Sequence, residues 1–271
     1  MIDNLVDIVI PVYKSEKFIR RCLSSMLNQT YKDIEVTVVY DESPDNTFKI
    51  LKEFEGEINI IKQNKKTSPA IAMNLALNKT DGEFIAFCGS DDFFEVNKIE
   101  RQVDFLRKYP EIGLVYTDAY VINQNGEIIK KYRCPEWNRK EWLHNHYIIM
   151  SSVLLRRDIL EKAGAHHDEK LSTCEDLELL IRLSNVTNFK RIPEFLTYYT
   201  IHTENLSKEQ LYRFDIDRVK IFYKHRLILP LLHSLFIFFR NQIISRIPIV
   251  NTTYEKVSKK IKKQHFWEDE V

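Results

Sequence analysis

The sequence predicts an α/β protein with a mostly parallel sheet, helices on both faces and a helical C-terminal extension. Short β-rich runs alternate with helical patterns through roughly the first 120 residues, and 44% of the 271 residues are apolar. Such alternation is typical of parallel sheets that are covered on both faces. Only 6 glycines and 8 prolines interrupt the chain, which argues against a low-complexity protein. We expect one unit over residues 1–210 and an extension over 211–271.

The first half of the chain reads as strands separated by helices. Short apolar, β-branched runs predict strands at Asp7–Tyr13, Ile34–Asp41, Asn59–Lys62, Glu83–Cys88 and Leu114–Thr117. Apolar residues at helical spacing predict helices after Ser15 and at Thr47–Phe54, Ala70–Leu77 and Ile99–Tyr109. Ser15 is expected to cap the first helix, and Pro69 suits the first turn of the third.

The second half has a less regular pattern. The dipeptide Asn125-Gly126 predicts a hairpin turn between Tyr120–Ile122 and Glu127–Ile129. A further strand is expected at Ser151–Arg156 and a further helix at Asp176–Leu183. The regular alternation of the first half therefore does not continue beyond about residue 120.

Charge and cysteine content exclude several classes of protein. Lys and Arg number 40 against 39 Asp and Glu, whereas a nucleic-acid-binding surface needs a basic excess. The four cysteines lie far apart with no CxxC pair, so no structural zinc site is expected. The N-terminal residues lack the pattern of a signal peptide, so a cytoplasmic location with reduced cysteines is expected.

Acidic residues follow several predicted strands at the point where each strand ends. Asp41 ends the second strand, and Asp91 and Asp92 follow the fourth. Ligands of open parallel sheets bind outside the carboxyl ends of the strands, so these side chains are expected in one region. Adjacent acids repel each other unless a cation lies nearby, and Mg²⁺ or Mn²⁺ bound together with substrate phosphates is a common solution. The alternative is a solvated turn or a helix N-cap.

Two further polar groups lie in the second half. Glu175 and Asp176 open a helical segment, where a carboxylate is either a general base for a hydroxyl group or only a helix cap. His202 follows an apolar and aromatic run, and a lone histidine is more often a structural residue than a ligand.

Six segments of the chain, taken in their order, resemble those of the family 2 glycosyltransferases, an inverting group with the glycosyltransferase-A fold. The segments that carry the resemblance are Val6–Thr47, AIAMNLAL around Asn74, Gly82–Asp92, Ser151–Leu171, Cys174–Leu183 and Tyr198–Ser207. Together they cover roughly residues 5–210. The resemblance implies a nucleotide-sugar half over 1–118 and an acceptor half over 119–210.

The resemblance also implies a binding site for a nucleotide sugar. Asp41 matches the acid that binds the nucleotide base, typically through the N3–H of a uracil or thymine. Pro11 and Tyr13 line the same base and ribose pocket. Asn74 lies in a donor-side motif, and Asp91 matches a ribose contact.

The same resemblance implies a metal ion and a catalytic base. Asp92 matches a ligand of a divalent cation, Mn²⁺ or Mg²⁺, and His202 matches a histidine that approaches the metal or the diphosphate. Asp176 matches the catalytic base, with Glu175 beside it.

Three positions depart from the family pattern. Tyr40 replaces the first of two acids after the second strand, and Gly89 replaces the first acid of the DxD-type motif. Met73 replaces an arginine that commonly precedes Asn74. His167 belongs to a pair that replaces a usual Gly-Phe, in an acceptor-side loop without an assigned role. An aromatic stretch, with Trp137, Trp142 and Tyr147, either stacks on an acceptor sugar or covers the sheet.

The function that these residues imply is metal-dependent, inverting transfer of a hexosyl or N-acetylhexosaminyl group. The favoured donor is a UDP-sugar, and the acceptor is a hydroxyl group of a saccharide or a lipid-linked saccharide. The expected context is the synthesis of a bacterial surface polysaccharide, lipopolysaccharide or capsule. Two alternatives stay open: a non-catalytic binding or scaffold protein of the same fold, and a sugar nucleotidyltransferase. The second normally carries a glycine-rich phosphate loop, yet residues 1–55 contain no glycine.

The C-terminal extension contains an apolar run that is too short to span a bilayer. Leu227–Phe239 has 13 uncharged residues, against the roughly 20 that a spanning helix needs. Five lysines follow between Lys256 and Lys263. Residues 227–263 therefore suit peripheral contact with the inner face of an anionic cell membrane. The alternative is a helix that packs on the first unit or on a second copy.

Overall fold

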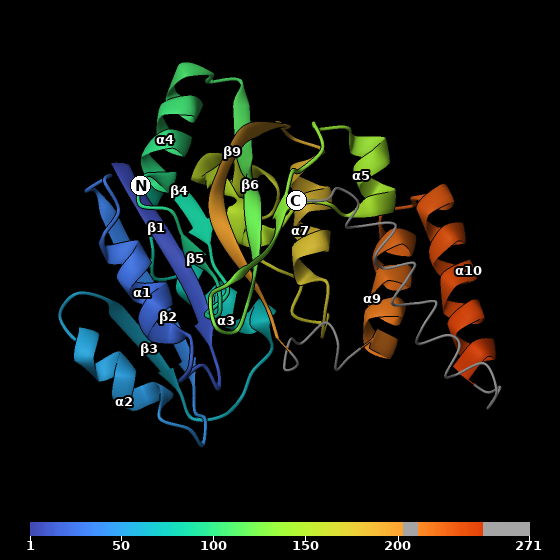
Figure 1. Ribbon diagram of the computed structural model, residues 1–271. Coiled ribbons are helices and arrows are strands. Elements are labelled where there is room, and N and C mark those ends of the chain that lie inside the picture. Colours follow the sequence, from blue (N-terminus) through green and yellow to red (C-terminus); the bar gives the residue numbers. More distant parts are fainter. Residues whose placement is uncertain (203–210, 246–271) are drawn as a thin grey trace.

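The computed structural model describes residues 1–202 and 211–245 (Figure 1). Its strands are β1 (Ile2–Val12), β2 (Ile34–Asp41), β3 (Asn59–Gln63), β4 (Gly82–Phe87), β5 (Phe93–Phe94), β6 (Ile112–Asn123), β7 (Ile128–Tyr132), β8 (Leu154–Arg156) and β9 (Asn188–Ile201). Its α-helices are α1 (Ile19–Leu27), α2 (Thr47–Leu51), α3 (Pro69–Leu77), α4 (Lys98–Lys108), α5 (Arg139–Asn145), α6 (Arg157–Lys162), α7 (Glu175–Leu183), α9 (Leu211–Lys224) and α10 (Ile228–Ser245). Short 3-10 helices lie at Lys52–Phe54 and Met150–Ser152.

One sheet runs through the molecule in the order β3-β2-β1-β4-β8-β6-β9-β5, with β7 paired to β6. The strands β3, β2, β1 and β4 are parallel, which confirms the prediction for the first half. Beyond β4 the sheet is mixed, because β8 runs antiparallel to both β4 and β6 while β6 and β9 are parallel. The predicted hairpin joins β6 to β7, and such a short connection requires antiparallel pairing.

Apolar side chains of successive strand residues alternate between two cores, one on each face of the sheet. In β1, Ile8 and Ile10 face the core formed with α1 and α4, whereas Val9 faces the core formed with α3 and α7. This period of two is the strand pattern of a sheet covered on both faces. Helices on both faces are therefore confirmed, and the carboxyl ends of the strands stay open at one edge of the sheet.

Two helix starts show how local sequence sets the loops at that edge. Ser68 caps α3, because its hydroxyl accepts a hydrogen bond from the backbone N–H of Ile71 and Pro69 occupies the first turn. Ser15 does not cap α1 as predicted: the N-cap is Phe18, without a side-chain bond. The Ser15 hydroxyl instead lies 2.5 Å from that of Ser90, so it ties the end of β1 to the loop after β4.

The described part of the C-terminal extension contains α9 and α10, which lie side by side at the end of the molecule away from α1 and α2 (Figure 1). One stripe of α10 carries exposed apolar side chains, at Ile228, Leu229, Leu232 and Phe236. Within residues 1–202 and 211–245, no helix is both long enough and apolar enough to cross a membrane. The predicted basic segment at 256–263 lies outside the described residues.

Candidate active site

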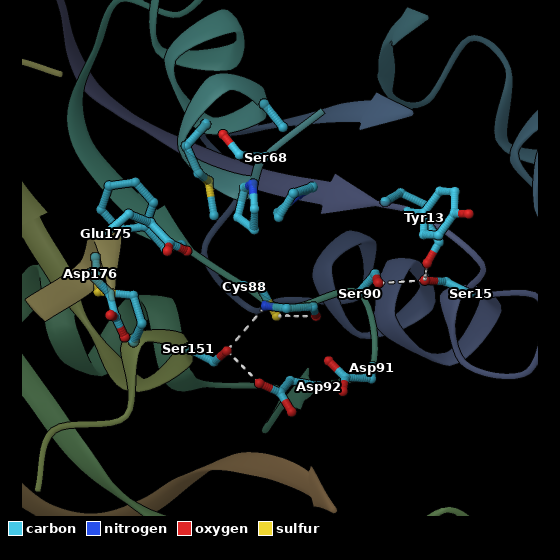
Figure 2. Close-up of a pocket in the computed structure, with 18 of the residues that line it drawn as sticks. Tyr13, Ser15, Ser68, Cys88, Ser90, Asp91, Asp92, Ser151, Glu175 and Asp176 are labelled. Carbon is cyan, nitrogen blue, oxygen red and sulfur yellow. Dashed lines mark hydrogen bonds between the residues drawn. The ribbon is translucent and has the colours of Figure 1, made fainter. Parts of the chain in front are cut away.

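A cleft of about 1090 Å³ opens at the carboxyl ends of β1, β2 and β4. Seven of the predicted site residues line it: Pro11, Tyr13, Asp41, Asp91, Asp92, Asp176 and His202. Figure 2 shows Tyr13, Ser15 and Ser90 on one side of the cleft and Glu175 and Asp176 on the other, with Asp91 and Asp92 between them. We call the part formed by Pro11, Tyr13 and Asp41 the β1 side, and the part formed by His146, His167, Glu175 and Asp176 the α7 side.

The β1 side holds its carboxylate with internal hydrogen bonds. Asp41 is 5% exposed, and Thr67 donates to it from the backbone N–H at 2.5 Å and from the hydroxyl at 3.0 Å. The Nζ atom of Lys66, which the sequence did not single out, lies 4.4 Å from the ring centroid of Tyr13. The β1 side therefore combines a fixed acceptor, an aromatic ring and a cation.

Asp91 and Asp92 are adjacent in sequence but have different surroundings. Asp92 is 3% exposed, and its carboxylate accepts hydrogen bonds from the Ser151 hydroxyl at 2.5 Å and from the Thr200 backbone N–H at 2.9 Å. Burial, and then the negative charge of Asp91, raise the pKa of the Asp92 carboxyl well above its usual range. Asp91 is the more open of the two and lies 2.9 Å from Nε2 of His202.

His202 joins this acidic pair through β9. Strand β9 pairs antiparallel with β5, directly after the two aspartates, and therefore brings Thr200 and His202 beside them. The imidazole also stacks on Phe18 with the ring centroids 4.8 Å apart. These contacts hold His202 at the cleft wall, between the loop after β1 and the loop after β4.

These side chains fit a divalent cation whose coordination the substrate completes. Among residues 1–202 and 211–245, no group of three or more His, Cys, Asp and Glu side chains is arranged to hold a metal ion. Mg²⁺ sites, however, commonly use one or two carboxylates plus substrate phosphates rather than a cage of protein ligands. Asp91, Asp92 and His202 supply such a partial set, and the mutual repulsion of the two acids favours a cation beside them.

The α7 side carries two carboxyl groups whose pKa values are raised. Burial, followed by the charge of Asp176, raises the pKa of Glu175 to about 8. Burial also raises the pKa of Asp176, although the backbone N–H of Leu177 donates to its Oδ1 at 2.7 Å. Cys174 precedes them in a left-handed conformation with φ 59° and turns the chain into α7. A carboxyl group with a pKa near neutrality is suited to accept a proton from a hydroxyl group.

Two histidines on the α7 side were not predicted as site residues. Within the described residues, the Nε2 atoms of His146 and His167 are buried without a hydrogen-bond partner, although both residues line the cleft. Burial lowers the pKa of His167 to about 4 and that of His146 to about 3, so both rings are neutral near pH 7. The sequence signal was the pair that includes His167, whose role the sequence left open.

Asn74 does not line the cleft. Its amide group donates to the His167 carbonyl at 3.1 Å and to Glu169 at 2.9 Å, and its carbonyl oxygen accepts from the His167 backbone N–H at 2.8 Å. The structure therefore places this predicted donor-site residue behind the cleft, where it fixes the loop that carries His167.

The three departures from the family pattern have structural settings of their own. Tyr40 is buried and stacks on Phe48, with ring centroids 5.0 Å apart. A Cβ atom at Gly89 would lie 2.7 Å from Oδ1 of Asp91, so a side chain there would displace that carboxylate. Met73 lines the cleft.

The aromatic stretch belongs mainly to the core. Trp142 is 1% exposed, and Trp137 packs against it and against Phe189, with ring centroids 5.6 and 4.2 Å away. Tyr147 is buried too, but it lines the cleft. The contacts of Trp137 therefore support a role in covering the sheet rather than in stacking on a sugar.

The chain belongs to glycosyltransferase family 2. The family model described as Glycosyl transferase family 2 matches residues 7–164, which is more than half of the chain. The fold agrees with that assignment. The structure is similar to S. aureus TarS in complex with UDP-GlcNAc, with a TM-score of 0.70, 19% identity and coverage of 97% of this chain and 78% of that one.

A second solved structure adds a metal complex to the comparison. It is the mannosyltransferase PcManGT from Pyrobaculum calidifontis in complex with GDP-Man and Mn²⁺, with a TM-score of 0.63, 17% identity and coverage of 84% of this chain and 68% of that one. Both likenesses show the glycosyltransferase-A fold: a mixed sheet with helices, followed here by C-terminal helices.

Curated relatives include enzymes of polysaccharide and lipid-linked sugar synthesis. Chondroitin synthase from Escherichia coli is 32% identical over 216 residues, which are 76% of this chain and 30% of the synthase. An Escherichia coli UDP-Glc:alpha-D-GlcNAc-diphosphoundecaprenol beta-1,3-glucosyltransferase is 38% identical over 162 residues, 59% of this chain and 63% of that enzyme. The chain spans less than a third of the chondroitin and hyaluronan synthases that it matches.

Proposed function

We propose that the protein is an inverting glycosyltransferase that moves a sugar from a nucleotide-diphosphate donor to a hydroxyl group of a saccharide or lipid-linked saccharide. The observation that carries the proposal is the pairing of two kinds of site in one cleft. Asp176, with its raised pKa, suits a general base, and it faces the same cleft as the nucleotide-type site at Asp41 and Asp91.

On the β1 side, Asp41 accepts a hydrogen bond from the nucleotide base, and Pro11 and Tyr13 line the base and ribose pocket. Asp91 contacts the ribose. Asp92 and His202, with Asp91 beside them, would hold a divalent cation, Mn²⁺ or Mg²⁺, which would supply positive charge to stabilise the leaving diphosphate. Asn74 acts indirectly, because it fixes the loop that carries His167 to the wall of the cleft.

On the α7 side, Asp176 accepts the proton of the acceptor hydroxyl while that oxygen attacks the anomeric carbon. A C–O bond forms between the acceptor and the sugar, the bond from the anomeric carbon to the diphosphate oxygen breaks, and its electron pair leaves with the diphosphate. Attack from the face opposite the leaving group inverts the anomeric carbon. Glu175 and Asp176 are half-buried at the cleft wall, so an acceptor that fills the cleft displaces water from around the base.

The donor that we favour is a UDP-sugar carrying a hexosyl or N-acetylhexosaminyl group, and the context is bacterial surface polysaccharide, lipopolysaccharide or capsule synthesis. The support is the UDP-GlcNAc complex of the TarS neighbour and the polysaccharide and diphosphoundecaprenol relatives. We further propose a cytoplasmic location with peripheral contact at the inner face of the membrane, through 227–263. The exposed apolar stripe of α10 supports this contact.

The test combines donor turnover with nucleotide binding. Wild-type protein is incubated with UDP-glucose or UDP-GlcNAc and Mn²⁺, and UDP release is measured with and without a panel of saccharide acceptors. Asp176→Asn is expected to lower turnover by about 10²- to 10⁴-fold, as loss of a general base does, while UDP affinity stays unchanged. Asp158→Asn, at an exposed site away from the cleft, is the matched control.

Nucleotide class and metal use are read from thermal unfolding with UDP, GDP, TDP and CMP, each with and without Mn²⁺. A ligand at about 100 times its dissociation constant adds about 2.7 kcal/mol to the free energy of unfolding. We expect the largest shift with UDP plus Mn²⁺, and its loss in Asp92→Ala. Absence of any shift would favour a scaffold protein, and full turnover by Asp176→Asn would remove the proposed base.

A further inference from the structure

A second cavity, of about 230 Å³, adjoins the cleft on the far side of Asp176. Three residues line both spaces: His146, Ile148 and Asp176. The rest of its wall is mainly apolar and comes from α5, α7 and α9: Trp142, Cys174, Leu177, Leu180, Phe214 and Arg218. A water molecule takes about 30 Å³ of liquid volume, so this side cavity admits a group much larger than one water.

Three of the residues that line the side cavity carry a buried polar atom without a partner in the described part of the protein. These are Nε1 of Trp142, Nε2 of His146 and Nε of Arg218, all buried. Indole and guanidinium N–H groups only donate, so an occupant has to offer acceptor oxygens. Leaving such groups unpaired in a buried site is costly, which is why unpaired groups point to a missing ligand.

Arg218 differs from other arginines of limited exposure in having no ion pair with a carboxylate among the described residues. Arg157 bonds Asp7 at 2.6 Å, and Arg191 bonds Asp118 at 2.7 Å. For Arg218, no ion pair with a carboxylate occurs among residues 1–202 and 211–245, and its guanidinium lies over the ring of Phe214 at 5.7 Å. Burial lowers its pKa, but a guanidinium stays charged at neutral pH.

We propose that the side cavity binds an acidic sugar unit of the acceptor, with a carboxylate or phosphate oxyanion on Arg218 and Trp142. The same unit presents its reacting hydroxyl to Asp176, which lines both spaces. An oxyanion matches the two donors, and the apolar wall with Phe214 accommodates the face of a sugar ring. The inference rests on the proposed function, because it assigns the acceptor class for that same base.

The test measures binding of small acidic and neutral sugars while saturating UDP occupies the cleft. The probes are glucuronate, N-acetylglucosamine 1-phosphate and, as neutral counterparts, methyl glucoside and N-acetylglucosamine. Ligand-observed NMR titrations give the affinities. We expect at least one acidic probe to bind about 10- to 100-fold more tightly than its neutral counterpart, the range of one charged hydrogen-bond pair. Carboxylate and phosphate probes then distinguish the two kinds of acidic unit.

Arg218→Met is expected to abolish this preference, whereas Lys220→Gln is expected to keep it. Lys220→Gln is the matched control, because this substitution removes a positive charge from an exposed position on the same helix. Equal binding of acidic and neutral probes, no binding of either acidic probe, or a preference that survives in Arg218→Met would overturn the proposal.

Thermal unfolding separates a binding role from a structural one. Arg218→Met is expected to fold with an unchanged or higher midpoint, since it removes a half-buried charge that makes no ion pair among the described residues, whereas Arg157→Met lowers the midpoint by leaving Asp7 without its ion pair. A large fall in the Arg218→Met midpoint would indicate a structural role. Donor turnover is measured on the same samples, so loss of the proposed function and loss of the acidic subsite give different results.

Discussion

The two sides of the cleft differ in whether their polar groups have hydrogen-bond partners within the protein. On the β1 side, the Asp41 carboxylate accepts hydrogen bonds from Thr67, and the nearby Ser15 and Ser90 hydroxyls bond each other. On the α7 side, His146 and His167 leave buried nitrogens unpaired among the described residues, and Glu175 and Asp176 have raised pKa values. The carboxylate of the β1 side is thus already held by hydrogen bonds, whereas the α7 side keeps polar groups without partners among the described residues.

The pH dependence of transfer provides the strongest test of this difference. The proposed base, Asp176, works only when ionised, and burial raises its pKa, so it loses its charge at a higher pH than an exposed aspartate does. We expect kcat/KM to fall about tenfold per pH unit as the pH drops below the pKa values of the Glu175 and Asp176 pair. UDP affinity, measured by calorimetry over the same range, is expected to change much less.

Glu175→Gln sharpens that measurement. Burial and the charge of Asp176 raise the pKa of Glu175 to about 8, so Glu175 is already neutral where the acid limb falls, and the limb is expected to keep its position in this variant. An acid limb that moves in this variant would show that Glu175, rather than Asp176, is the base whose titration limits transfer.

Asp41→Asn is expected to weaken UDP binding by about 1.5–3 kcal/mol, the range for a hydrogen bond to a charged group. Calorimetric titration with UDP measures this loss. The acceptor KM should stay the same, because Asp41 lies on the β1 side. Thr67→Val retains the carboxylate and removes only one of its donors, so its effect should be smaller. Equal losses in the two variants would mean that Asp41 acts by holding Thr67.

Asn74→Ala is the variant with the smallest expected effect, and it tests whether Asn74 belongs to the α7 side of the cleft or to the donor site. The variant leaves the backbone of His167 without its partners, so it should lower the free energy of unfolding by about 1–3 kcal/mol and raise the acceptor KM. UDP affinity should not change. Asn78→Ala is the control, at the C-cap of α3, where the side chain contacts the exposed His166. A selective loss of UDP affinity in Asn74→Ala would return Asn74 to the donor site.

The sequence predicted the β1 side well because its signals are local. A β-branched run followed by Asp41, or by Asp91 and Asp92, places each group at a strand end, and parallel strands bring those ends together. Pairing of β8 between β4 and β6 is not encoded in so short a segment, and the mixed half of the sheet was not predicted.

The α7 side was harder to predict because its properties arise from packing. Nothing in the sequence distinguishes Arg218 from a surface arginine on an amphipathic helix. Its burial depends on α9 packing near Trp142, and the orientation of His167 depends on Asn74, 93 residues away. Only contacts between distant segments reveal which groups lack partners.

The position of β8 also limits how the enzyme can be recombined with its relatives. Its strand comes from the second half of the chain but lies between β4 and β6, and residue 118 falls inside β6. The two proposed halves, 1–118 and 119–210, therefore share one hydrogen-bonded sheet. In a chimera joined at residue 118, β8 of one parent would have to pair with β4 of the other, and β6 would contain the junction itself. Exchange of acceptor specificity is better attempted through α5 and α9, which border the side cavity and leave the sheet intact.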